Sequence, residues 1–131
     1  MSDEQVIRGA IDSWNAGGVD AFMEHVTPDI EWHAPQGFPE GEHWHGRDAV
    51  TGALSDQFKA VFTSGQVEIR SMKPGPGGWL VAIHHAVEGQ ASGMDLEWSV
   101  YVVFELEGDR IRKMSAFLER DDAMRAAGFD G

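Results

Sequence analysis

Histidine is the side chain of this protein best suited to move a proton near neutral pH, because its unperturbed pKa is about 6.5. The chain has six histidines and no cysteine. His84 lies within an alternating stretch, residues 79–89, in which most of the other side chains are apolar. In such surroundings an imidazole can exchange a proton with a carbonyl-containing substrate. The alternative is a core histidine bonded to one neighbouring group.

Three further histidines, His33, His43 and His45, lie in or near a segment rich in glycine and proline. If the segment is extended, His43 and His45 present two imidazoles on one face, a spacing that can serve a metal. Zinc sites need three or four ligands, and the sequence fixes no third partner. We therefore predict a solvated loop, with no metal site and no cofactor.

Aromatic side chains could line a pocket for a flat apolar ligand. Trp14, Trp32 and Trp98 each fall on a stripe that is expected to face inward, and Met114 and Leu118 do so on the last strand. The alternative is plain core packing, because aromatic side chains also fill cores. The pocket residues that we predict are Trp14, Trp32, Phe38, Phe58, Phe62, Trp98, Met114 and Leu118.

The N-terminal half has the apolar period of helices. Ser2 and Gln5 have the spacing of a capping box, an apolar stripe follows over residues 6–14, and Gly17 and Gly18 end this helix. Shorter stripes predict helices over residues 19–26 and 50–62. Residues 29–34 alternate as a short strand, and residues 35–46 are predicted to be a loop.

After residue 65 the period changes to two, which is typical of strands. Strands are predicted over residues 66–73, 79–89, 95–107 and 110–119, followed by a short closing helix over 121–127. Helices at one end of an antiparallel meander define an α+β domain. We predict one domain that covers residues 1–131.

Four segments of the chain resemble the SnoaL-like branch of the nuclear transport factor 2-like superfamily. They are WNAGGVDAF (residues 14–22), VTPDIEWHAP (26–35), HGRDAV (45–50) and FELEGDRI (104–111). The resemblance implies a cone-shaped, cystatin-like α+β fold, in which a curved antiparallel sheet packs on three N-terminal helices. It also implies an apolar pocket. The family includes ketosteroid isomerases, polyketide cyclases and proteins without catalysis, so the fold alone does not settle the function.

The catalytic residues of these relatives are mostly absent. The positions of the isomerase oxyanion tyrosine, general base and second oxyanion donor fall on Ala10, Ala34 and Val100, none of which moves a proton. We therefore predict no isomerisation of 3-ketosteroids at an enzymatic rate. The last-strand acid of epoxide hydrolases falls on Ala116. The acid of the cyclases falls on Ala116 or Glu119, so Glu119 is a second catalytic candidate.

The resemblance also implies a facing for residues 79–89 and makes His84 the leading catalytic candidate. Members of the superfamily often dimerise through the sheet, so an apolar outward face predicts a homodimer. Replacing Ile83 with aspartate should then split the dimer. The expected inward set is Leu80, Ala82, His84, Ala86 and Glu88, and the expected outward set is Trp79, Val81, Ile83, His85 and Val87.

The composition of the chain excludes some classes of binding partner. The chain carries 22 acidic and 10 basic residues, for a formal net charge of −12. Such a surface disfavours nucleic acid and anionic membranes. The acidic, polar start lacks the pattern of a secretory signal, and the apolar runs are too short to span a membrane. We expect a cytoplasmic protein.

Two functions remain open from the sequence. In the first, the protein is a cofactor-free enzyme that isomerises, cyclises, dehydrates or hydrolyses a small hydrophobic molecule, with His84 as the leading proton carrier and Glu119 or Glu88 as second candidates. In the second, the protein binds a small molecule in the same pocket without chemistry, or acts as a dimeric interaction module.

Overall fold

The structure is a computed structural model, and it describes residues 2–33, 43–61, 66–88 and 95–129. At residues 56–61, 66–67, 85–88 and 95–99 the description covers the backbone alone. Within the described ranges, no helix is both long and apolar enough to cross a membrane.

The first helix begins where its capping signal predicts. Helix α1 spans Asp3–Gly17, and the Ser2 hydroxyl accepts a hydrogen bond from the Gln5 backbone N–H while the Gln5 side chain accepts one from the Ser2 N–H. This capping box satisfies two backbone donors at the helix start. At the other end, Gly18 adopts φ +80° and its N–H donates to the Trp14 carbonyl.

The short elements that follow turn the chain onto the edge of the sheet. They are α2 (Val19–Phe22), the 3₁₀ turn η1 (Met23–His25), β1 (Val26–His33), β2 (His43–His45) and α3 (Arg47–Val61). Strand β2 lies inside the segment that was predicted to be a loop, and it pairs antiparallel with β1. The Arg47 guanidinium donates to the carbonyls of Met23 and Val26 at 3.1 and 3.0 Å, which ties α3 to this turn.

The later strands follow the predicted meander. They are β3 (Gln66–Gly75), β4 (Gly78–Glu88), β5 (Asp95–Glu107) and β6 (Arg110–Phe117), and α4 (Arg120–Ala126) closes the chain. The strand order in the sheet is β2-β1-β6-β5-β4-β3. Because β1 pairs parallel with β6, the sheet is mixed rather than purely antiparallel as predicted.

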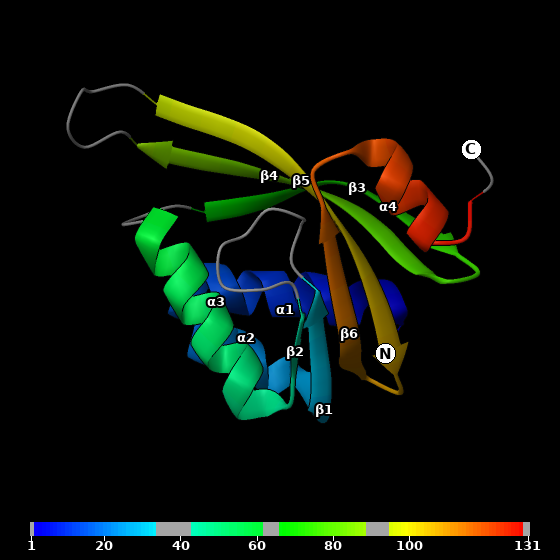
Figure 1. Cartoon of the computed structure of the whole chain (residues 1–131), viewed down its shortest axis with the longest axis horizontal. Coiled ribbons are helices and arrows are strands. Elements are labelled where there is room, and N and C mark those ends of the chain that lie inside the picture. The colour runs from blue at the N-terminus through cyan, green and yellow to red at the C-terminus, as the bar shows by residue number, and fades with distance from the viewer. Residues whose placement is uncertain (1, 34–42, 62–65, 89–94, 130–131) are drawn as a thin grey trace.

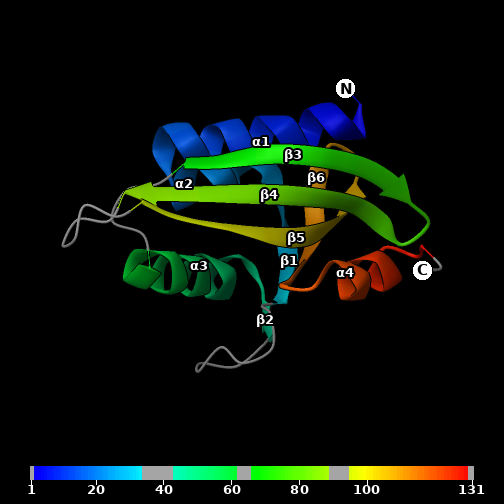
Figure 2. The same cartoon turned by 90° about the horizontal axis from the view of Figure 1, so that it is seen from above.

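The sheet is strongly curved and its helices lie at different ends. Strands β3 to β5 arch across the molecule, α3 lies at one end of the arch, and α4 lies at the other end beside the β3–β4 turn (Figures 1 and 2). Helix α1 runs along the sheet with its C-terminus toward α3 (Figure 2). The end of β4 and the start of β5 also lie at the α3 end (Figure 1).

The main core lies between the helices and one face of the sheet, which we call the inner face. Val81 and Ile83 of β4 are 0% and 5% exposed, and they pack in this core with Val102 and Phe104 of β5. The cluster also takes Ile7 and neighbours from α1, together with side chains of α3, β1 and β6.

A smaller core lies on the opposite, outer face. Leu80 and Val103 pack there against Ala123 and Ala127 of α4 and its C-terminal end. Alternation along β4 therefore places Val81 and Ile83 on the inner face and Leu80, Ala82 and His84 on the outer face. The predicted facing of these residues was wrong.

Candidate functional site

The inner face carries aromatic side chains among aliphatic ones. Trp14 of α1 is partly buried against the core, and its ring meets Phe22 edge-on, with centroids 5.5 Å apart and planes at 83°. Trp32 is 5% exposed and stands between Trp44 of β2 and Met114 of β6 in the strand register. Among the described buried residues the only polar one is Thr27, so this interior is apolar.

The structure places some of the predicted pocket residues in the inner core and one of them on the surface. Trp14, Trp32 and Met114 contact the inner core, and Met114 is 3% exposed. Leu118 is 59% exposed because β6 ends at Phe117, so its inward placement was wrong. The predictions for Phe38, Phe62 and the side chains of Phe58 and Trp98 lie outside what the structure describes.

His84 does not stand on the inner face. It pairs with Glu68 of β3 and Ser99 of β5 in the register, while its neighbour Ile83 is buried in the inner core opposite Val100. Alternation therefore turns His84 outward, half-buried on the same face as Leu80. The prediction of an inward proton carrier at His84 was wrong.

Glu119 also lies away from the inner core. The strand that was expected to include it ends two residues earlier, and Glu119 occupies the N-cap position of α4. It is exposed there, and its side chain makes no capping hydrogen bond. Met114 and Ala116, which are 3% and 4% exposed, pack in the inner core, and Glu119 is not part of that cluster.

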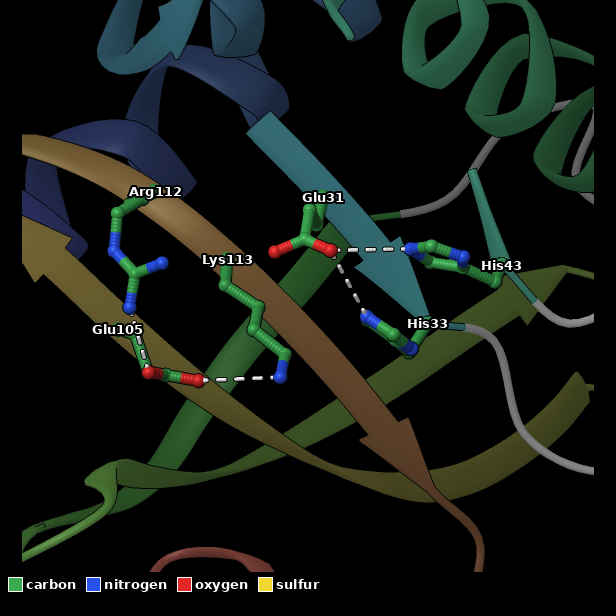
Figure 3. Close-up of polar contacts among 6 residues, drawn as sticks. All are labelled: Glu31, His33, His43, Glu105, Arg112 and Lys113. Carbon is green, nitrogen blue, oxygen red and sulfur yellow. Dashed lines mark hydrogen bonds and ion pairs between the residues drawn. The ribbon is translucent and has the colours of Figure 1, made fainter. Parts of the chain in front are cut away.

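The outer face of β1 and β2 carries a cluster that the sequence did not assemble. Glu31 and His33 alternate with the buried Ile30 and Trp32, so both face outward. His43 stands directly opposite His33 across the β1–β2 pair. The side chains of Glu31, His33 and His43 point toward one another (Figure 3). One donor atom from each lies within 4.8 Å of the other two.

The contacts within this cluster are short. Glu31 Oε1 lies 3.2 Å from His43 Nε2 and 3.8 Å from His33 Nε2. The two imidazole rings stack, with centroids 4.2 Å apart and planes at 24°. His33 Nε2 is enclosed and has no hydrogen-bond partner among the described residues.

The surroundings set the charge states of the cluster. Burial lowers the pKa of His33, and the nearby His43 and Lys113 lower it further. The hydrogen bond from His43 is the main cause that lowers the pKa of Glu31. At neutral pH the cluster therefore combines a neutral imidazole at His33 with a charged carboxylate.

A second set of charges borders the cluster on β5 and β6. Lys113 stands opposite Glu31 in the register, and its ammonium lies 3.6 Å from Glu105 Oε2. Arg112 donates to Glu105 Oε1 at 2.9 Å (Figure 3). Glu105 thus offsets part of the positive charge that faces Glu31.

The sequence analysis considered His33 and His43 and found no third partner for them, so it missed Glu31. The available signal was the i, i+2 spacing of Glu31 and His33, which shares one strand face. The cross-strand pair of His33 and His43 depends on β2, and the glycines and prolines around that strand hid it.

The chain belongs to the SnoaL-like domain family, whose sequence profile matches residues 7–114. None of the curated proteins matches it in sequence.

Solved structures share its fold at low identity. An NTF2-like protein of unknown function from Burkholderia pseudomallei is 17% identical, with 98% of this chain and 99% of that chain covered and a TM-score of 0.75. For TerC, co-crystallised with polyporic acid, the identity is 12%, the coverage 95% and 97%, and the TM-score 0.74. A putative SnoaL-like polyketide cyclase from Jannaschia sp. CCS1 is 17% identical, with 98% and 92% covered and a TM-score of 0.69.

Proposed function

We propose that this SnoaL-like protein binds a small aromatic or hydrophobic molecule against its inner face without catalysing a reaction on it. The observation that carries the proposal is the apolar interior, in which Thr27 is the one polar side chain among the described buried residues. Burial of apolar surface would supply the affinity, and aromatic rings would favour a flat ligand.

The inner-face side chains that the structure describes include no acid–base candidate, which favours binding over catalysis. His84 and Glu119 were the leading candidates, and both stand away from the inner face. Acid–base catalysis needs a titratable group within hydrogen-bond reach of the reacting atom. Among the described side chains this face offers tryptophan surface for stacking instead.

The proposed position is the end of the inner face where α1 finishes and α3 lies. Trp14 stands in the last turns of α1 and is only partly covered by the core. Trp79 makes a matched control, because it is also partly buried against the same core. It lies toward the other end of α1, where its indole N–H donates to Asp3 Oδ2 at 3.4 Å.

The test is a titration of the purified full chain, monitored by fluorescence, with two aromatic probes. They are polyporic acid and 8-anilinonaphthalene-1-sulfonate. We expect at least one probe to bind, and Trp14→Ala to weaken its affinity about tenfold or more, because a stacked tryptophan carries a large share of binding energy. Trp79→Ala and His84→Ala should bind within about twofold of the parent, since neither residue borders the proposed position.

Three results would overturn this proposal. The first is no binding of either probe up to about 1 mM, which corresponds to about 4 kcal/mol of binding free energy. The second is an equal loss of affinity in the Trp14 and Trp79 variants. The third is chemical conversion of a bound probe, detected by chromatography, which would show that the protein is an enzyme.

We also propose that the chain forms a homodimer, through the outer face of the long strands rather than the face first predicted. Ala82 and His84 are half-buried on this face, and Tyr101 beside Ala82 packs against the part that α4 covers. Members of this fold with an uncovered outer sheet face can pair through it. Sedimentation velocity at micromolar concentration tests the association, and a monomer there would refute it.

A further inference from the structure

We propose that Glu31, His33 and His43 form a binding site for a divalent transition metal, with Zn²⁺ as the ion that fits best. The proposal is independent of the small-molecule function, because these residues face outward and the inner face lies on the other side of the same strands.

The scaffold holds the three side chains in place before any ion arrives. Glu31 and His33 project from one face of β1, and His43 is the direct cross-strand partner of His33. Trp32 anchors the strand between them because it is 5% exposed in the inner core. Sites built on paired strands need little reorganisation when the ion binds.

The spacing of the donor atoms is close to that of a zinc site. Zinc lies about 2.0–2.2 Å from imidazole nitrogen and carboxylate oxygen, which separates tetrahedral donors by about 3.3 Å. Glu31 Oε1 is 3.2 Å from His43 Nε2 and 3.8 Å from His33 Nε2. All the donor atoms lie within 4.8 Å of one another, and the two stacked rings would rotate out of parallel so that both nitrogens face one ion.

The donor types suit a cation. Zinc binds imidazole nitrogen and carboxylate oxygen, which are the donor atoms of this cluster. His33 Nε2 is enclosed and lacks a hydrogen-bond partner among the described residues, and an ion would satisfy it.

Binding would change the hydrogen bonding of His43. In the cluster its Nε2 meets Glu31 Oε1 at hydrogen-bond distance. When Nε2 binds the ion, it gives up the proton that it donates to Glu31, a neutral ring then carries a proton on Nδ1 instead, and Glu31 exchanges the hydrogen bond for a metal bond. Two imidazoles and one carboxylate favour zinc and its transition-metal neighbours over Ca²⁺, which prefers six to eight oxygen ligands.

Lys113 is the group that opposes a cation here. It stands opposite Glu31 in the β1–β6 register, so its charge lies beside the cluster. Glu105 lies 3.6 Å from its ammonium and offsets it. The formal net charge of −12 also favours cation binding over the whole chain.

Isothermal titration calorimetry of the tag-free full chain, after treatment with a chelator, tests the site with ZnCl₂. We expect one Zn²⁺ per chain with a micromolar dissociation constant, no heat with CaCl₂, and weaker binding at pH 5.5 than at pH 7.5 because protons compete for imidazole. His33→Ala, His43→Ala and Glu31→Gln should each weaken binding about tenfold or more.

His45→Ala is the control variant, since His45 is exposed on the same strand and stands opposite Glu31 in the register, but its donor atoms lie outside the cluster. It should bind like the parent. Circular dichroism in the presence of chelator establishes that every variant is folded, and Glu31→Gln keeps the shape of the side chain. The proposal fails if the parent binds no Zn²⁺, if the cluster variants bind like the parent, or if His45→Ala loses as much affinity as they do.

Discussion

Replacing Ile83 with aspartate is expected to unfold the protein at room temperature or to lower its melting temperature by about 15 °C or more. Ile83 is 5% exposed, and it packs in the inner core beside Val81 and Val102. The substitution removes buried apolar volume, and it also buries a carboxylate without a partner. Each of these effects costs about 3 kcal/mol or more, out of a total stability of about 5–15 kcal/mol.

Ala82→Asp is the matched control for Ile83→Asp, because it places the same charge one residue earlier on the outer face. Ala82 is half-buried there, opposite Tyr101. Within one chain we expect it to cost about 1 kcal/mol, since its carboxylate can reach water there, whereas at the proposed outer-face dimer contact the same charge would oppose association. Thermal unfolding followed by circular dichroism measures both variants. If Ile83→Asp melts like the parent while Ala82→Asp unfolds, the assignment of the two faces is reversed.

Replacing Gly78 with alanine is expected to lower the free energy of unfolding by about 3 kcal/mol. Gly78 starts β4 with φ +141°, a conformation that side chains rarely adopt. An added Cβ would lie 2.9 Å from both the Phe104 carbonyl oxygen and Val103 Cγ1. Backbone strain costs about 1–3 kcal/mol, and forcing the packed neighbours apart costs a similar amount.

Gly108, in the turn between β5 and β6, separates backbone strain from crowding. It has φ +63°, and nothing lies within 4 Å of an added Cβ. Gly108→Asn should therefore cost about 1 kcal/mol or less, because asparagine tolerates this conformation. Urea denaturation compares the two variants through their midpoints at constant slope. If the free energy of unfolding of Gly78→Ala lies within about 0.5 kcal/mol of the parent's, the crowding around Gly78 has little effect on stability and the prediction is wrong.

Local patterns predicted most of the elements. The capping box at Ser2 and Gln5 placed the start of α1, and the strand predicted over residues 95–107 coincides with β5. Such signals depend on neighbouring residues, which a sequence displays directly. Strand β2 was missed because its three residues lie in a segment rich in glycine and proline, where only the pairing with β1 makes a strand.

The facing of β4 could not be derived from alternation. Leu80 and Ala82 on one side of the strand are as apolar as Val81 and Ile83 on the other, because each face is partly covered. The choice depends on long-range pairing, which sets Ile83 opposite Val100 and Val81 opposite Val102. A slip of one residue exchanges the faces of a strand, and the placement of His84 failed for that reason.

The cluster of Glu31, His33 and His43 also could not be predicted from local spacing. The residue types were visible, but Glu31 and His43 are 12 positions apart and meet only because β2 folds back onto β1. Spacing along one strand predicts which side chains share a face. It does not predict which residue of another strand stands beside them.

The most direct test of the proposed function is a ¹H–¹⁵N spectrum of the tryptophan indoles, recorded while polyporic acid is titrated into the labelled chain. The chain has five tryptophans, so each indole signal can be assigned by replacing one residue at a time. The binding account predicts a large shift of the Trp14 signal, with little change at Trp79 near the start of α1. Shifts that leave Trp14 unchanged and appear at Trp79, or on the outer-face residues around His84 in the backbone spectrum, would contradict it.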